Sequence, residues 1–113
     1  MGRSGLINRG DIVVVALQGD SGKPRPAVII QANWFNTLAT VVALPLTSHL
    51  QDAAALRTNV TPSEANGLRV PSQVAIDRPQ TVRLTKIGPM VGRVEEDVML
   101  AINRALAVFL GAA

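Results

Sequence analysis

Arginine dominates the positive charge of this sequence, and arginine is the side chain best suited to hold a phosphate. The 113 residues include eleven Lys and Arg, nine of them Arg, against eight Asp and Glu. A planar guanidinium offers a fork of N–H donors that matches phosphate oxygens, and it also stacks on bases. Residues 1–93 hold ten of the cations and five acids, whereas residues 94–113 hold one cation and three acids. This basic body makes nucleic acid a reasonable partner, the alternative being ordinary solvated surface charge.

The sequence has few residues that could serve thiolate catalysis, a metal site or a nucleotide-binding loop. The chain has no Cys, which excludes thiolate catalysis and disulfides. One histidine, His49, is too few for a zinc site, and the acids form no coordinating cluster beyond residues 95–97. Gly22-Lys23 is not a phosphate-binding P-loop, because Leu17 stands where its first glycine should be. We therefore expect neither a metal nor a cofactor.

The elements that must position these residues are mostly short strands. Runs rich in β-branched and apolar residues, separated by Gly, Pro, Asn and Ser, predict strands. They cover residues 11–17, 27–31, 40–46, 57–60, 70–77 and 81–87. Pro45 cannot donate a ladder hydrogen bond, so it marks an edge or bulge near the end of its strand. Residues 50–56 form a loop, and Pro62 after Thr61 predicts one helical turn that ends at Gly67.

One helix closes the chain. The acids at 95–97 suit the positive end of a helix dipole, and Gly111 ends the pattern. Apolar residues recur at steps of three and four, which predicts a face that packs on the sheet. They are Val98, Ala101, Ile102, Ala105, Leu106 and Phe109. The predicted fold class is mainly β with a C-terminal α-helix, as a small, curled antiparallel sheet or barrel.

The length allows one domain, residues 1–113, with 1–8 expected to be flexible. Apolar runs such as 41–46 and 105–110 are six residues long, far shorter than the roughly 20 residues that span a bilayer. The N-terminus lacks the apolar region of a secretory signal. These features predict a soluble protein of the cytoplasm that does not enter membranes.

Short segments of the chain follow one another in an order typical of a bacterial family. They are residues 9–15, 23–30, 44–48, 59–60, 66–68, 72–77 and 86–88, and the helix between Gly92 and Gly111. Over about residues 9–111 this order resembles the MazF/PemK toxins of toxin–antitoxin systems. The resemblance implies an SH3-like barrel, a homodimer and metal-independent cleavage of single-stranded RNA, which leaves a 2′,3′-cyclic phosphate and a 5′-hydroxyl. It also implies inhibition by a small acidic antitoxin.

The resemblance places the family's catalytic residues on Arg25 and Thr47, with Ser48 beside Thr47, and its aspartate on Asp77. Metal-free RNA cleavage needs a deprotonated 2′-hydroxyl, a stabilised phosphorane and a protonated 5′-oxygen. Arg25 suits the second task because it stays charged, Thr47 can donate to the same phosphate, and Asp77 is the candidate base. The alternatives are a surface ion pair for Arg25, strand-end capping for Thr47 and turn capping for Asp77. Ala75 replaces an arginine that PemK-like members carry.

A second set of residues is predicted to bind RNA around these. Single-stranded RNA is held by stacking on aromatic side chains in a basic groove. The candidates are Lys23, Trp34, His49, Arg57, Arg83 and Lys86. Of Trp34 and Phe35, one is expected to pack inward while the other stacks on a base or seals a dimer contact, and Phe109 is expected in the core. His49 is two residues from Thr47 and has a side chain suited to proton transfer, although a lone loop histidine is more often solvated.

Two rival functions share these features. Gyrase poisons of the CcdB type have the same fold and act by binding, and a non-catalytic RNA-binding barrel would also be basic. The gyrase activity is associated with an aromatic residue before a glycine near the C-terminus, where this chain has Leu110-Gly111. The Arg25 and Thr47 signatures favour RNA cleavage.

Overall fold

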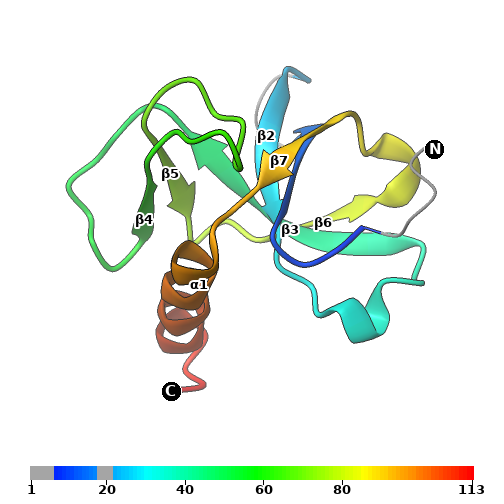
Figure 1. Cartoon of the computed structure of the whole chain (residues 1–113). Helices are drawn as coiled ribbons and strands as arrows, with labels where there is room; N and C mark the ends of the chain where they lie inside the picture. The colour runs from blue at the N-terminus through cyan, green and yellow to red at the C-terminus, as the bar shows by residue number, and fades with distance from the viewer. Residues whose placement is uncertain (1–6, 18–21) are drawn as a thin grey trace.

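The computed structural model describes residues 7–17 and 22–113, which form strands and one C-terminal helix (Figure 1). The strands are β1 (Asp11–Ala16), β2 (Pro24–Ile29), β3 (Thr40–Thr47), β4 (Arg57–Val60), β5 (Ser72–Ala75), β6 (Gln80–Arg83) and β7 (Met90–Arg93). Two short 3-10 helices, η1 (Asn33–Phe35) and η2 (Leu84–Lys86), connect them, and α1 (Glu96–Phe109) closes the chain. Of the segment 1–8, residues 1–6 lie outside the described part of the chain, and Ile7 is buried.

The strands pair antiparallel in the order β4-β5-β3-β2-β1-β7, with β6 also paired to β3. Figure 1 shows the sheet curling, with β6 and η1 on one side and β4, β5 and α1 on the other. The predicted fold class, mainly β in a curled antiparallel sheet with a C-terminal helix, is confirmed.

The long strand β3 connects the two parts of the sheet. Thr40–Ala43 pair with β6, and Leu46 and Thr47 pair with β5, while β2 runs along the other side. Pro45 was predicted to mark an edge or a bulge near the end of its strand. Strand β3 is central, but Pro45 itself pairs with β2 and with neither β6 nor β5, so the prediction holds for one side of the strand at this position. Pro45 falls where the partner of β3 changes from β6 to β5, so its missing N–H costs no bond to either of those strands.

Two apolar clusters fill the two sides of the sheet, because neighbouring residues on a strand point to opposite faces. One joins the helix to the sheet and includes Ile12, Val28, Leu44 and Ile102. The other is formed by Val13, Val15, Ala27, Ile29, Val41, Ala43 and Val82, with Ile7 and Leu17. The run Ile12–Val15 is therefore buried almost throughout, as its β-branched sequence predicts.

Several boundaries differ from the prediction. Strand β7 was not predicted, and the strands expected at 70–77 and 81–87 are shorter, the second ending in η2. The predicted burial of Phe109 is wrong, since its side chain is 43% exposed. Neither Trp34 nor Phe35 packs inward, because they are 88% and 51% exposed.

Candidate active site

The register of β2 and β3 brings Arg25 and Thr47 together. Ala27 pairs with Pro45, and the two strands run antiparallel. Extending this register by two residues, back along β2 and forward along β3, sets Arg25 opposite Thr47, and both residues line the same cleft. Because side chains alternate along a strand, both lie on the same face as the Ala27–Pro45 pair. Two segments that are twenty-two residues apart thus present a guanidinium and a hydroxyl to one place.

Arg25 and Thr47 line a cleft of about 810 Å³. Its apolar lining includes Val14, Leu46 and Val91. Four arginines line it: Arg25, Arg57, Arg69 and Arg78. Ser48 and His49 line it as well, and no Asp or Glu is among its described lining residues. A hollow that has several guanidinium groups and no carboxylate among its described lining residues suits a polyanion, and its apolar walls suit a base.

The Thr47 hydroxyl is oriented by its own loop. Its Oγ1 accepts the backbone N–H of His49 at 3.0 Å. A hydroxyl has one hydrogen to donate and two lone pairs, so this bond leaves the O–H able to donate to a ligand in the cleft. The Arg57 Nη1 donates to the carbonyl oxygen of His49 at 3.4 Å. The backbone of His49 is thus held on both sides.

A second loop, residues 61–71, brings Arg69 and Val70 to the cleft, and Asn66 organises it. The Asn66 side chain is fully buried, and its Oδ1 accepts the N–H groups of Ser63 at 2.9 Å and Leu68 at 3.0 Å. Its Nδ2 donates to the carbonyl of Thr61 at 2.8 Å. The loop therefore takes its shape from one buried amide, since leaving such a group without partners is costly. The helical turn predicted here is a hydrogen-bonded turn that no helix continues, with the N–H of Gly67 bound to the carbonyl of Ser63.

Glu95, just before α1, ties this loop to the helix. Its carboxylate accepts from the hydroxyl of Ser63 and from Asn66 Nδ2, the latter at 3.2 Å. The bond from the Ser63 hydroxyl holds the pKa of Glu95 below its ordinary value, because it favours the charged form. The start of the helix thereby anchors the loop that carries Arg69.

Three of the remaining predicted residues do not line the cleft itself. Asp77 is exposed and is not among the cleft's lining residues, although it precedes Arg78, which is. Arg83 and Lys86 line a neighbouring hollow of about 480 Å³, which shares Pro79 and Gln80 with the cleft. This hollow continues the cleft along β6.

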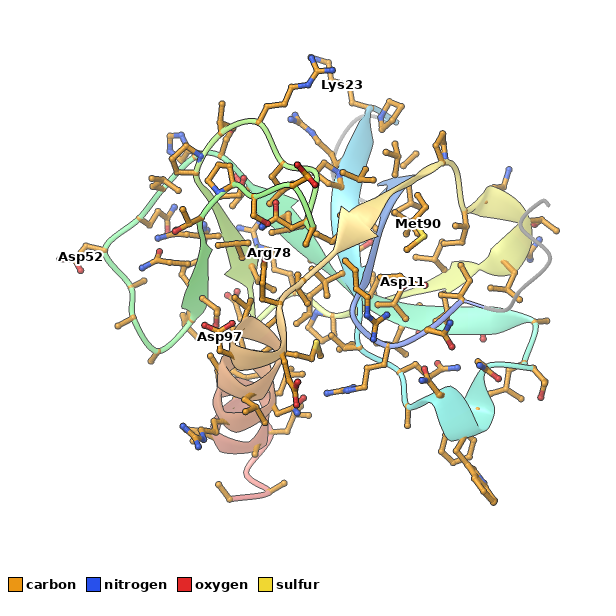
Figure 2. The ribbon with its side chains drawn as sticks, viewed as in Figure 1. Asp11, Lys23, Asp52, Arg78, Met90 and Asp97 are labelled. Atoms are coloured by element: carbon orange, nitrogen blue, oxygen red, sulfur yellow. The ribbon has the colours of Figure 1, made fainter. Side chains whose placement is uncertain are left out.

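Two predicted RNA contacts lie outside both hollows. Lys23 is exposed just before β2, at the upper edge of the molecule in Figure 2. Trp34 lies on η1, which is at the opposite end of the view in Figure 1 from the start of β2. The structure thus does not bring Trp34 to Arg25. It remains an exposed aromatic side chain away from the cleft.

Comparison with known proteins places this chain in a family. A model described as PemK-like, MazF-like toxin of type II toxin-antitoxin system matches residues 8–110. The chain belongs to this family. It is also 42% identical over 108 residues, which is 95% of this chain and 99% of the relative, to the probable endoribonuclease MazF of Mycolicibacterium smegmatis. The predicted family is confirmed.

Solved structures of the family have the same fold. An endoribonuclease from a mycobacterial species, in complex with its cognate antitoxin, has a TM-score of 0.81 at 28% identity, covering 95% of this chain and 97% of that one. MazF from Deinococcus radiodurans has a TM-score of 0.78 at 18% identity, over 96% and 99% of the two chains. The curled sheet and C-terminal helix are thus the fold of MazF-like toxins.

Arg69 and Arg78 are cleft residues of this family member that were not predicted from the sequence. Both stand in irregular segments between strands, where no periodicity shows which way a side chain points. The signal that could have found Arg69 is its place directly after the Asn66–Leu68 segment, which the family resemblance includes.

Two further observations concern metals and membranes. Within residues 7–17 and 22–113, no three side chains of His, Asp or Glu are grouped as metal ligands would be. In the same part of the chain, no helix has both the length and the apolar character that crossing a membrane requires.

Proposed function

We propose that this chain is an endoribonuclease toxin that cuts single-stranded RNA in the cleft between Arg25 and Thr47. The observation that carries the proposal is the position of these two side chains on facing strands, in a hollow lined by four arginines. It is supported by membership of the MazF-like family and by the 42% identity to a relative named as an endoribonuclease.

Each residue has a task in metal-independent cleavage. Arg25 donates to the non-bridging oxygens of the scissile phosphate and stabilises the phosphorane as its charge grows. Thr47 donates its hydroxyl hydrogen to the same phosphate, with Ser48 beside it. The 2′-hydroxyl gives up its proton and attacks phosphorus, and the bond to the 5′-oxygen breaks as that oxygen takes up a proton. The products are a 2′,3′-cyclic phosphate and a 5′-hydroxyl end.

Two side chains are candidates for the proton transfers. Asp77 is the candidate base from the family pattern, although it lies outside the cleft lining. His49 lines the cleft, and an imidazole can both accept and donate a proton in catalysis. Arg57, Arg83 and Lys86 bind flanking phosphates along the cleft and its continuation.

The protein acts as a homodimer in the cytoplasm and is inhibited by an acidic antitoxin segment. A basic cleft with apolar walls binds a flexible acidic chain by the same forces that hold RNA, which makes the two ligands competitors. Saturating antitoxin peptide should then displace a fluorescent, uncleavable RNA. Simultaneous binding without loss of affinity would place the inhibitor elsewhere.

One experiment separates this function from its rivals. The purified protein is incubated with a long RNA in EDTA, and separately with DNA gyrase and supercoiled DNA. Cleavage of the RNA with gyrase unaffected is the expected result. Arrest of gyrase without RNA cleavage would identify a gyrase poison, and RNA binding without cleavage would identify a non-catalytic barrel.

A further inference from the structure

Gln73 in β5 is a buried side chain whose amide holds the loop that follows Thr47. Gln73 is 6% exposed. Its Oε1 accepts the backbone N–H of Gln51 at 3.0 Å, and its Nε2 donates to the backbone carbonyl of Gln51 at 3.1 Å. Because the Gln73 amide bonds both the N–H and the carbonyl of Gln51, it replaces the pair of hydrogen bonds that a neighbouring strand would make. Gln51 is thereby fixed against β5.

The same residue is also bound to the start of this loop. Thr47 and Gln73 are paired across the β3–β5 ladder. Gln73 therefore holds both ends of the segment 47–51, one through its backbone and the other through its side chain. Between these two points lie Ser48 and His49, which line the cleft. Beyond them the chain runs outward to Asp52, which Figure 2 shows at the outer edge of the molecule.

The amide of Gln73 has two further neighbours. Arg57 Nη1 lies 3.5 Å from Gln73 Oε1 and also donates to the carbonyl of His49. Gln73 Nε2 donates to Asn59 Oδ1 at 2.9 Å, and Asn59 does not line the cleft. Gln73 therefore contacts a cleft arginine on one side and a residue outside the cleft on the other, which supplies a matched control.

We propose that Gln73 is a positioning residue for RNA cleavage. It holds the segment 47–51 so that the Thr47 hydroxyl, Ser48 and His49 face the phosphate bound by Arg25. Gln73 itself does not touch RNA in this role. The inference rests on the proposed function, and it adds a residue that acts through the loop. Displacing a catalytic group by about 1 Å can cost about 10²-fold in rate, so the loss of this loop anchor should lower the cleavage rate measurably.

Three variants test the proposal. Gln73→Met keeps the length and volume of the side chain but removes the hydrogen bonds to Gln51. Asn59→Ala removes one bond of Gln73 and leaves the two bonds to Gln51 in place. Gln73→Glu keeps an acceptor for the Gln51 N–H but sets a carboxylate oxygen against its carbonyl oxygen, so it should not restore what methionine loses.

Two activity measurements separate positioning from binding. In Gln73→Met, the single-turnover rate at saturating RNA should fall about 10- to 100-fold. The Kd for an RNA with a 2′-O-methyl group at the cleavage site should change by less than about threefold, because the arginines that bind phosphate remain. Asn59→Ala should match the parent protein in both, and Gln73→Glu should be slowed as Gln73→Met is. A saturating rate within about threefold of the parent in Gln73→Met would overturn the proposal.

A measurement without RNA keeps the proposal separate from the proposed function. Amide hydrogen exchange by NMR should show the Gln51 N–H protected in the parent and in Asn59→Ala, and exchanging faster in Gln73→Met while β1 and β2 stay protected. Unchanged protection of Gln51 in Gln73→Met would refute the anchoring role. A parent protein that cuts no RNA would refute the proposed function instead, while the exchange data would still decide whether Gln73 holds the loop.

Discussion

Replacing Gly67 by alanine should destabilise the fold by more than a positive φ alone explains. Gly67 has a φ of +69°, a backbone conformation that costs an L residue about 1–2 kcal/mol. A Cβ at this position would overlap the carbonyl oxygen of Val91 in β7 and lie 3.1 Å from the carbonyl carbon of Val91. These are backbone atoms, so the loop and β7 must move apart, and forced overpacking costs a further 1–3 kcal/mol or so. The expected loss is about 2–5 kcal/mol.

Gly111 provides the matched control. It also has a positive φ, of +75°, but an added Cβ would meet nothing within 4 Å. Gly111→Ala should therefore lose only about 1 kcal/mol, the cost of the backbone conformation after the end of α1. Urea unfolding of the parent and both variants, followed by circular dichroism, gives the two losses. Equal losses, within about 0.5 kcal/mol, would show that the loop does not pack against Val91 as described.

The same comparison reports on the cleft. Gly67 precedes Leu68, Arg69 and Val70, which all line it. Separating this loop from β7 should weaken RNA binding in Gly67→Ala and leave Gly111→Ala at the parent affinity. If both variants bound RNA equally, the segment 68–70 would not form part of the RNA surface.

Three further predictions concern charge and proton transfer. Asp77→Asn should lower the rate at saturating RNA by about 10²-fold or more if Asp77 is the general base, and an unchanged rate measured across pH 5–9 would remove that assignment. Affinity for single-stranded RNA should fall with salt, and Arg69→Ala should reduce the log–log slope by about 0.7, one phosphate contact; an unchanged slope would place Arg69 outside the RNA path. The pKa of Glu95 is lower in the folded protein than its ordinary 4.5, so the charged group stabilises the fold above that pH and this contribution is lost as the pH falls through the folded value. Glu95→Gln should accordingly be less stable than the parent at pH 7, with the difference shrinking on acidification in urea unfolding; a difference that does not change with pH would contradict the role of its charge.

The sequence predicted strands wherever residues are buried on both faces. The run 11–17 is β-branched because β1 lies between two apolar clusters, and such a run has few alternatives to a strand. Strand β7 escaped prediction because Met90–Arg93 is short, follows Pro89 and contains Gly92. The reason for a glycine at position 92 is visible only in the folded chain, where a Cβ would lie 2.5 Å from the backbone of Asn66.

Helical periodicity predicted the direction of the α1 side chains but not where the core ends. Ile102 and Leu106 are buried against the sheet. Ala101, also on the predicted face, and Phe109, one turn beyond Leu106, are exposed, Phe109 by 43%. Spacing along a helix shows which residues share a face, and the extent of the partner surface decides how many of them are covered.

The candidate site was also predicted only in part, because the sequence does not show which loop residues reach it. Arg25 and Thr47 came from the resemblance to the MazF/PemK toxins, whose short segments can be recognised in the sequence without the fold. The contribution of Arg69 and Arg78 depends on loop shape, which is determined by contacts such as those of the buried Asn66. Trp34 was a candidate by residue type alone, and type does not show on which end of the molecule a side chain lies.

The most direct test of the proposed active site is the cleavage of single-stranded RNA by the parent protein and by Arg25→Ala, under single-turnover conditions in EDTA. The parent should cut and leave 2′,3′-cyclic phosphate and 5′-hydroxyl ends. Arg25→Ala should lose about 10²- to 10³-fold in rate with an unchanged circular dichroism spectrum, and Arg25→Lys should recover little because a point charge lacks the fork geometry. Cleavage near the parent rate by folded Arg25→Ala, or a parent that cuts only after Mg²⁺ is added, would contradict the proposed site and its chemistry.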